Sequence, residues 1–164
     1  MSDSEARTTA DAPAPEAPEY EVLSFSAAVA PGGRALGLKI VRTDGQLATL
    51  LLAGPVVAHL HRVLAGTLRA RKGLAELPTD AEFFRRMPRW SEGDWADPAL
   101  PRPIGCEIVT HPDMCRLSFP RGEGKAPMRF RLRPLHAGYL LHAIHDAVEN
   151  EELDLRVPEA ATVH

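Results

Sequence analysis

Hydrophobic and polar residues alternate over several stretches of this chain, and a period of two is typical of β-strands. Each set of three such stretches is followed by apolar residues at helical spacing, with a proline near the helix start at Pro55 and at Pro134. The order strand, strand, strand, helix is therefore predicted twice. The predicted strands cover residues 22–29, 36–40 and 47–53, and then 104–108, 115–119 and 128–132.

The two halves of the chain also match each other. Residues 36–69 align without a gap with residues 115–148, at an offset of 79 and with five identities in 34 positions. This internal repeat predicts that each half is one β-β-β-α unit. A three-stranded sheet with one helix buries too little surface to be stable alone, so we expect the two units to pack about a pseudo-two-fold into one α+β domain.

The segments outside the repeats differ in composition. The N-terminal segment is rich in Pro, Ala and Glu, has a net charge of −4 and lacks an apolar period, so it is expected to be a disordered acidic tail. The segment between the repeats holds four of the nine aromatic residues and is expected to fold back over one sheet or to cover a groove. The predicted division is a tail at 1–19, a single domain at 20–150 and an acidic C-terminal tail at 151–164, the domain comprising repeat one at 20–73, a connecting segment at 74–103 and repeat two at 104–150.

Short motifs predict two local features. Asp44 and Gly45 stand between two predicted strands, where this dipeptide favours a tight hairpin turn. Thr79 and Glu82 have capping-box spacing and predict a short helix over residues 80–87 of the connecting segment.

The composition is that of an ordinary globular protein, with 164 residues, 45% hydrophobic, 25% charged and a net charge of −3. We expect a cytoplasmic protein, because the N-terminus lacks the apolar core of a secretory signal. The longest apolar stretch, residues 47–58, is too short to cross a bilayer, so no membrane contact is expected. Cys106 and Cys115 flank a predicted turn and are expected as buried thiols, with a cross-strand disulfide as the alternative.

Three arginines alternate with apolar residues at the end of repeat two. In a strand, Arg129, Arg131 and Arg133 would share one face, while the apolar residues between them face the core. Arg116 on the preceding strand and Arg121 in the intervening turn extend this basic face. Guanidinium groups about 7 Å apart suit successive phosphates of a polyanion. The alternative is a solvated outer face whose arginine stems cover apolar surface.

Two tryptophans, Trp90 and Trp95, lie among arginines in the connecting segment. Aromatic rings interleaved with arginine are typical of single-stranded nucleic acid binders, in which bases stack on the rings. The same composition occurs in protein interfaces, where Trp and Arg contribute much of the binding energy. A third interpretation is that the two rings only cover the side of the domain.

The equivalent face of repeat one is apolar. Leu50 and Leu52 align with Arg129 and Arg131, and Val41 lies on the adjacent predicted strand. A strand that is apolar on both faces should be buried on both. The cover could be the connecting segment, the other repeat or a second copy of the chain, so these three apolar residues are candidate interface residues. An exposed apolar patch would mark a homodimer or a protein-docking face there.

Sequence signatures of catalysis do not occur in this chain. We find no phosphate-binding loop, dinucleotide-binding glycine motif, nucleophile elbow or Cys-x-x-Cys pair, and therefore expect no enzyme activity and no cofactor. Seven histidines are present, and His142 and His145 could share a helix face, but no third residue has ligand spacing. Surface histidines are expected rather than a metal site.

In architecture alone, a duplicated sheet followed by a helix resembles the single-stranded-DNA-binding modules of the Whirly type, which have four strands per helix where three are predicted here. No site residue follows from this resemblance. The leading hypothesis is a non-catalytic protein that binds a polyanion, best guess single-stranded nucleic acid, through the arginine face. The alternative is an adaptor or assembly subunit that docks a protein partner through the apolar face of repeat one or the Trp-containing segment.

Overall fold

The computed structural model describes residues 18–70, 77–122, 124–150 and 153. The predicted tails lie outside the described residues, except for Pro18, Glu19 and Leu153. Glu19 already belongs to the first strand. Leu153 is buried, and its N–H donates to the Ala147 carbonyl. In chain order the elements are β1 (Glu19–Val29), β2 (Ala35–Arg42), β3 (Leu47–Ala53), α2 (Gly54–Ala70), α3 (Ala81–Arg85), α4 (Glu92–Ala96), β4 (Glu107–His111), β5 (Met114–Phe119), β6 (Met128–Leu132) and α5 (Pro134–Asn150). This order confirms the predicted α+β class.

The six strands form one mixed sheet in the order β3-β2-β1-β6-β5-β4. The two halves meet at β1 and β6, which run parallel over three residue pairs, from Glu19 with Arg129 to Glu21 with Arg131. This pairing joins the first strand of one predicted unit to the third strand of the other, and the predicted pseudo-two-fold between the units is not shown by it.

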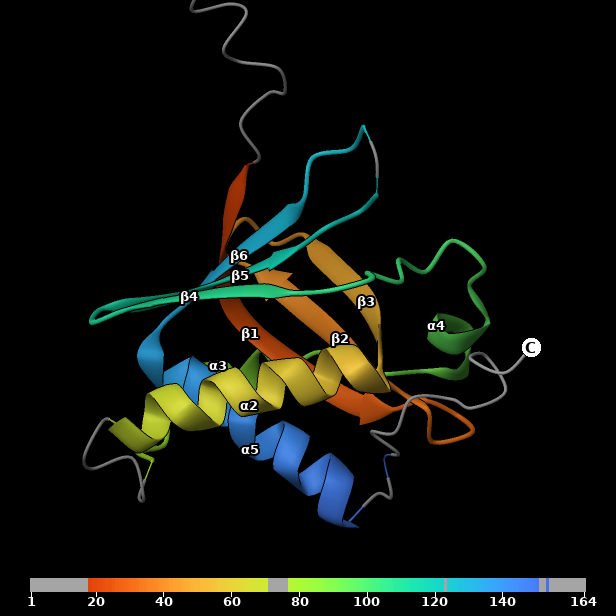
Figure 1. Cartoon of the computed structure of the whole chain (residues 1–164). Helices are drawn as coiled ribbons and strands as arrows, with labels where there is room; N and C mark the ends of the chain where they lie inside the picture. Colours follow the sequence, from red (N-terminus) through yellow and green to blue (C-terminus); the bar gives the residue numbers. More distant parts are fainter. Residues whose placement is uncertain (1–17, 71–76, 123, 151–152, 154–164) are drawn as a thin grey trace, which may run out of the picture.

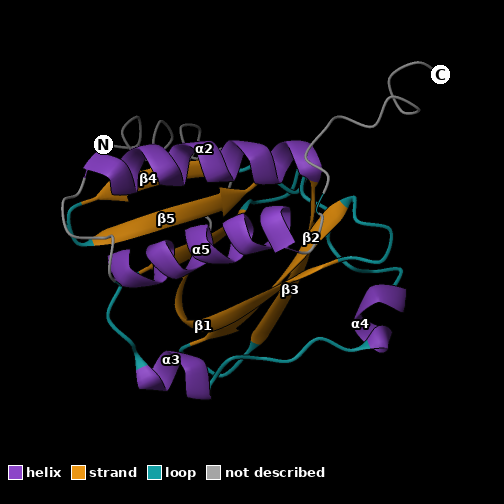
Figure 2. Ribbon diagram, turned by 90° about the horizontal axis from the view of Figure 1, so that it is seen from below, coloured by secondary structure: helices purple, strands orange, loops and turns teal. Residues whose placement is uncertain are grey.

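Both long helices cover the same face of the sheet. Figures 1 and 2 show α2 and α5 lying next to each other across the strands, and the two helices contact each other. Contacts of α2 with both edge strands, β3 and β4, show that the sheet curls around the helix pair. The alternating residues that face these helices form the buried core, among them Leu36, Leu38, Leu117, Phe119 and Phe130.

The sheet bends where β1 changes partner. Val22 pairs with Arg42 and Ser24 pairs with Val41, so Leu23 is an extra residue in β1. Such a bulge kinks a strand and redirects the side chains beside it. The first three residues of β1 pair with β6, and those after the bulge pair with β2. The bulge therefore separates the two halves of the sheet.

The alignment of the two repeats changes by one residue after their second strands. In the first hairpin Ile40 pairs with Ala48, whereas its counterpart Phe119 pairs with Met128 across a loop that is one residue longer. The offset therefore becomes 80 from β3 onward, and Leu50 is the counterpart of Phe130. The prediction that Leu50 and Leu52 occupy the arginine positions is wrong for this reason.

The predicted interface residues belong mostly to the core of the monomer. Leu50 and Leu52 are fully buried, so neither offers an exposed docking surface. Val41 is half-buried on the opposite face of the sheet. The exposed apolar residue at this edge is Leu47, at the start of β3, with 57% of its surface accessible.

The connecting segment folds back onto the sheet at two places. In α3, Phe83 is buried against Phe25, and its carbonyl accepts a hydrogen bond from the buried Ser24 hydroxyl at 2.6 Å. The helix begins one residue later than predicted, because Asp80 rather than Thr79 caps it by accepting from the Phe83 N–H. The segment is thus part of the domain.

The second contact is a pair of tryptophans on the sheet face opposite the long helices. Trp90 and Trp95 stack with ring centroids 4.3 Å apart, and both rings lie over Gly37 of β2. The Trp90 indole N–H donates to the Ser26 carbonyl at 3.4 Å, and Lys39 donates to the Arg89 carbonyl at 2.9 Å. The two rings therefore cover the domain, in agreement with the third interpretation of the sequence.

Replacing Gly37 by Ala is expected to destabilise the protein by about 1–3 kcal/mol, the usual range for an overpacked site. A Cβ at this position would lie 2.5 Å from a Trp90 ring carbon and 2.7 Å from a Trp95 ring carbon, so the stacked pair must shift. Urea unfolding followed by tryptophan fluorescence measures both effects. As a control, Gly66→Ala in the exposed part of α2 meets no atom within 4 Å and should stabilise by about 0.5–1 kcal/mol. An unchanged midpoint for Gly37→Ala would contradict this packing.

The start of repeat two differs from the predicted strand. Residue Ile104 was expected in the first strand, but β4 begins only at Glu107, and Ile104 is 83% exposed. The prolines at 101 and 103 and the glycine at 105 do not favour a β-ladder here.

Cys106 and Cys115 are both buried thiols, and burial raises the pKa of Cys106 to about 12. Among the described helices, none is both long and apolar enough to traverse a bilayer.

Candidate functional site

The arginines of β6 lie on the face predicted for them. Arg129 and Arg131 alternate with Phe130 and Leu132, which are buried in the core. Arg131 is exposed and Arg129 is half-buried. On the neighbouring strand β5, Arg116 is the register partner of Arg131. Two neighbouring strands thus present guanidinium groups on the surface that the long helices leave open.

Acidic residues from β1 lie on the same face. The parallel pairing places Glu19 beside Arg129 and Glu21 beside Arg131. Glu19 also forms an ion pair with Arg116. The hydrogen bond from Arg116, aided by the charges of the two β6 arginines, lowers the pKa of the Glu19 carboxyl. The repulsion expected among the arginines is therefore relieved inside the chain, and the face is mixed in charge.

A second group of cations lies at the start of β6. A cleft of about 260 Å³ is lined by Arg102, Arg121 and Lys125, together with prolines and Met128 of β6. No acidic residue of the described chain lines it. Arg121 holds the β5–β6 loop by donating to the Ala126 carbonyl at 2.6 Å. This cleft extends the basic surface beyond one end of the strand.

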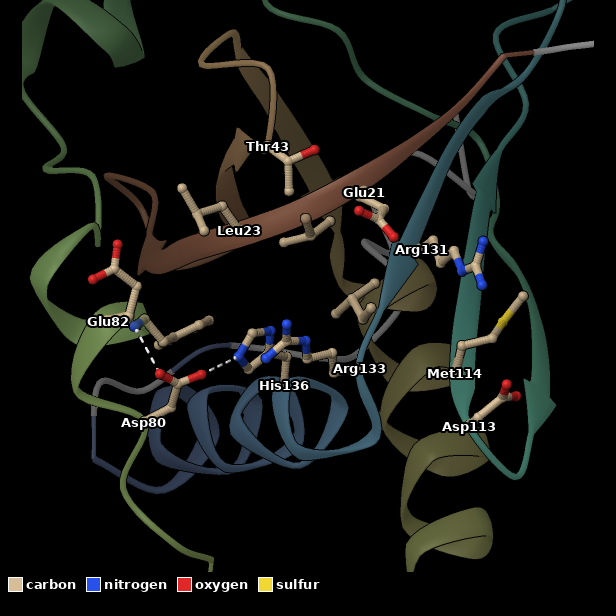
Figure 3. A pocket seen from close by; sticks show the side chains of 13 residues that line it. Glu21, Leu23, Thr43, Asp80, Glu82, Asp113, Met114, Arg131, Arg133 and His136 are labelled. Atoms are coloured by element: carbon tan, nitrogen blue, oxygen red, sulfur yellow. Dashed lines mark hydrogen bonds and ion pairs between the residues drawn. The ribbon is translucent and has the colours of Figure 1, made fainter.

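A larger pocket opens at the other end of β6, where α5 begins. Its volume is about 310 Å³, at the lower end of the range for small-molecule sites. Figure 3 shows that its walls come from β1, β6, α3, the β4–β5 turn and the first turn of α5. Arg133 lines this pocket instead of continuing the β6 row, because the strand ends at Leu132 and the Arg133 carbonyl accepts the first helical bond, from Ala137. The polar and charged lining residues are Glu21, Thr43, Asp80, Glu82, Asp113, Arg131, Arg133 and His136.

A histidine–aspartate pair forms one wall of this pocket (Figure 3). His136 is only 3% exposed, and its Nε2 is hydrogen-bonded to the Asp80 carboxylate at 2.9 Å. The Asp80 carboxylate also accepts from the Phe83 N–H at 3.2 Å. The hydrogen bond with His136, the Phe83 N–H and the charge of Arg133 lower the pKa of Asp80. The second ring nitrogen of His136, Nδ1, is buried and has no hydrogen-bond partner within the described part of the chain.

The remaining hydrogen bonds fix the position of Asp80. The Tyr139 hydroxyl accepts from the Asp80 N–H at 2.8 Å and donates to the Pro78 carbonyl at 2.5 Å. The rings of Tyr139 and His136 both pack against Phe83. Two residues of α5 therefore hold the N-terminal end of α3 in place.

Of the charged residues that line this pocket, only Arg131 and Arg133 were predicted from the sequence as site residues. A signal for His136 was present, because it stands four and eight residues before Leu140 and Ile144, on the core-facing stripe of the helix. A histidine on that stripe is buried, not on the surface. Nothing local to Asp80 or Glu21 indicated a pocket, because their neighbours there come from distant parts of the chain. Among the described residues, no group of His, Cys, Asp or Glu side chains could hold a metal ion.

The stability that Asp80 contributes is expected to depend on pH. Because folding lowers the pKa of this carboxyl, its contribution is complete above about pH 4 and is lost as the pH falls through the folded-state value. Asp80→Asn should therefore destabilise the protein at pH 7, and the difference from the unchanged protein should shrink between about pH 4 and pH 2. Denaturant midpoints at several pH values measure this difference. A gap that stays constant down to pH 2 would contradict the pairing.

Comparison with protein-family models and with curated proteins finds no match for this chain. The features that bear on function are therefore the arginine face and the two clefts at its ends.

Proposed function

We propose that this protein binds an extended polyanion, specifically single-stranded nucleic acid, along β6. The observation that supports this most strongly is the placement of cations along that strand. The cleft with Arg121 lies at its start, Arg129 and Arg131 lie on the strand itself, and Arg133 lies in the pocket at its end. A negatively charged chain that follows β6 would meet a guanidinium group at each step.

The spacing of these groups suits a phosphate backbone. Alternate residues of a strand are about 7 Å apart, and the stretch from residue 128 to residue 133 spans about 17 Å. An extended single strand could place roughly three phosphates over that distance. Arginine is the side chain best suited to such contacts, because its planar guanidinium can donate two hydrogen bonds to one phosphate.

The acids on the same face make the binding weak and sensitive to salt. A phosphate that approaches Arg116 must compete with Glu19, and Glu21 repels a phosphate near Arg131. The tryptophans provide little stacking for bases, because Trp90 and Trp95 stack on each other and cover Gly37. We therefore propose recognition of the backbone, with little preference for base sequence.

The test is the affinity for a labelled oligothymidylate at increasing salt, measured by fluorescence anisotropy. Changing Arg129, Arg131 and Arg133 together to Ser should abolish binding or reduce the slope of log K against log salt by about 0.7 for each phosphate that the variant no longer neutralises. A matched control changes Arg34, Arg62 and Arg89 to Ser, which removes the same charge from exposed positions that line neither cleft.

Equal affinities of the two triple variants would overturn the proposal, since net charge alone would then explain the binding. No measurable binding of the unchanged protein at low salt would also overturn it. The alternative, docking of a protein partner through the apolar face of repeat one, has less support, because Leu50 and Leu52 are buried in the monomer.

A further inference from the structure

We propose that the pocket at the start of α5 binds the phosphate monoester of a nucleotide. This pocket differs from the face of β6, because it is a cavity with a buried polar wall. The phosphate could belong to the end of a nucleic acid strand or to a free nucleotide. If it belongs to a strand end, the inference depends on the proposed function, since the terminal phosphate would enter the pocket while the rest of the nucleic acid follows β6. If it belongs to a free nucleotide, the inference is independent of the proposed function.

The cationic side of the pocket is suited to a dianion. Arg131 and Arg133 both line it, and both are exposed and can reorient toward a ligand. The first turn of α5 adds the N–H groups of Leu135 and His136, which have no acceptor within a helix that begins at Pro134. Two guanidinium groups and the start of a 17-residue helix favour a doubly charged phosphate over the singly charged phosphodiester.

The buried histidine is the independent indication of a ligand. His136 lines the pocket, its side chain is only 4% exposed, and its Nδ1 lacks a hydrogen-bond partner among the described residues. A buried polar atom without a partner is costly, so a donor or acceptor supplied by a ligand would be favourable there. Asp80 fixes the ring through Nε2, which leaves the buried Nδ1 as the ring nitrogen without a partner among the described residues.

The acids of the pocket define the other end of the ligand. Asp80 is engaged by His136 and the Phe83 N–H, and Glu82 pairs with Arg85 and Arg86, so neither opposes the phosphate fully. Glu21 and Asp113 remain as acceptors on the walls formed by β1 and the β4–β5 turn. Carboxylates accept hydrogen bonds from hydroxyl or amino groups, so the ligand combines a phosphate with such donors, as a nucleotide does.

The experiment compares oligothymidylates that carry a 5′-phosphate, a 3′-phosphate or only hydroxyl ends, and in parallel thymidine monophosphate with thymidine. A strand end as the source predicts about tenfold tighter binding of one phosphorylated oligonucleotide than of the hydroxyl form. A free nucleotide as the source predicts that the monophosphate binds and thymidine does not. In either case the imidazole NMR signals of His136 should shift on binding.

Arg133→Ser tests the pocket with little risk to folding, because Arg133 is exposed. It should remove the preference for the phosphate, whereas Arg34→Ser, with the same loss of charge in the β1–β2 turn, should keep it. The inference is overturned if no phosphate-dependent binding occurs in either arm, or if the preference survives Arg133→Ser. If phosphorylated and hydroxyl-ended oligonucleotides bind equally and thymidine monophosphate does not bind, this inference alone is overturned. A monophosphate that binds through Arg133 while no oligonucleotide binds would overturn the proposed function alone.

Discussion

Replacing Phe83 by Ala is expected to lower the free energy of unfolding by about 3–5 kcal/mol, the usual cost of removing a buried aromatic side chain. Phe83 is 1% exposed and contacts Phe25, His136 and Tyr139. Its removal would leave a cavity between β1 and α5, and the α3 segment would no longer be anchored by its main apolar side chain. Urea unfolding monitored by circular dichroism measures this change.

The neighbouring Phe84 provides the matched control. It belongs to the same helix and is 48% exposed, so Phe84→Ala should cost much less than Phe83→Ala. Similar losses for the two variants would contradict the placement of α3. A destabilised Phe83→Ala protein should also show a smaller effect of a second change, Asp80→Asn, because the two residues hold the same segment against α5.

Replacing Leu50 by Ala is expected to cost about 2–5 kcal/mol. Leu50 is fully buried in β3, on the same face of the sheet as Leu38, its partner in β2. The cost arises from the smaller apolar surface that is buried and from the cavity left beneath α2. Thermal and urea unfolding would both detect it.

This second prediction also tests which residues of β3 face the core. Leu47 lies in the same strand but is 57% exposed, and Leu47→Ala should change stability by less than about 0.5 kcal/mol. A shift of one residue in the pairing would reverse the two faces of the strand and change these values. A small effect of Leu50→Ala would make this residue a candidate interface position again.

Local features of the fold followed well from the sequence. The Asp44–Gly45 turn is present, with Gly45 at a φ of 86°, and both long helices begin beside the predicted prolines. These features depend on steric preferences of a few adjacent residues, which the sequence displays directly. The short helix α3 was placed almost correctly, although Asp80 rather than Thr79 caps it.

The candidate site was predicted only in part. Alternation along β6 was sufficient to place Arg129 and Arg131 on the outer face, because the period of a strand determines the side of each residue. The one-residue difference between the two hairpins was not recognised, and it moved Leu50 and Leu52 from the proposed docking face into the core. The histidines were all expected on the surface, and the buried His136 was therefore missed.

The sequence by itself determined most of the strands, the Asp44–Gly45 turn, the helix starts and the outer face of β6, because each follows from the preferences and spacing of neighbouring residues. Only the tertiary structure decided that β1 joins β6, which brings Glu19 and Glu21 among the arginines, and that α3 docks on α5, which pairs Asp80 with His136. The physical reason is that the partners of these contacts are more than fifty residues apart along the chain. Their meeting depends on how the sheet and the helices pack, and no local pattern encodes that choice.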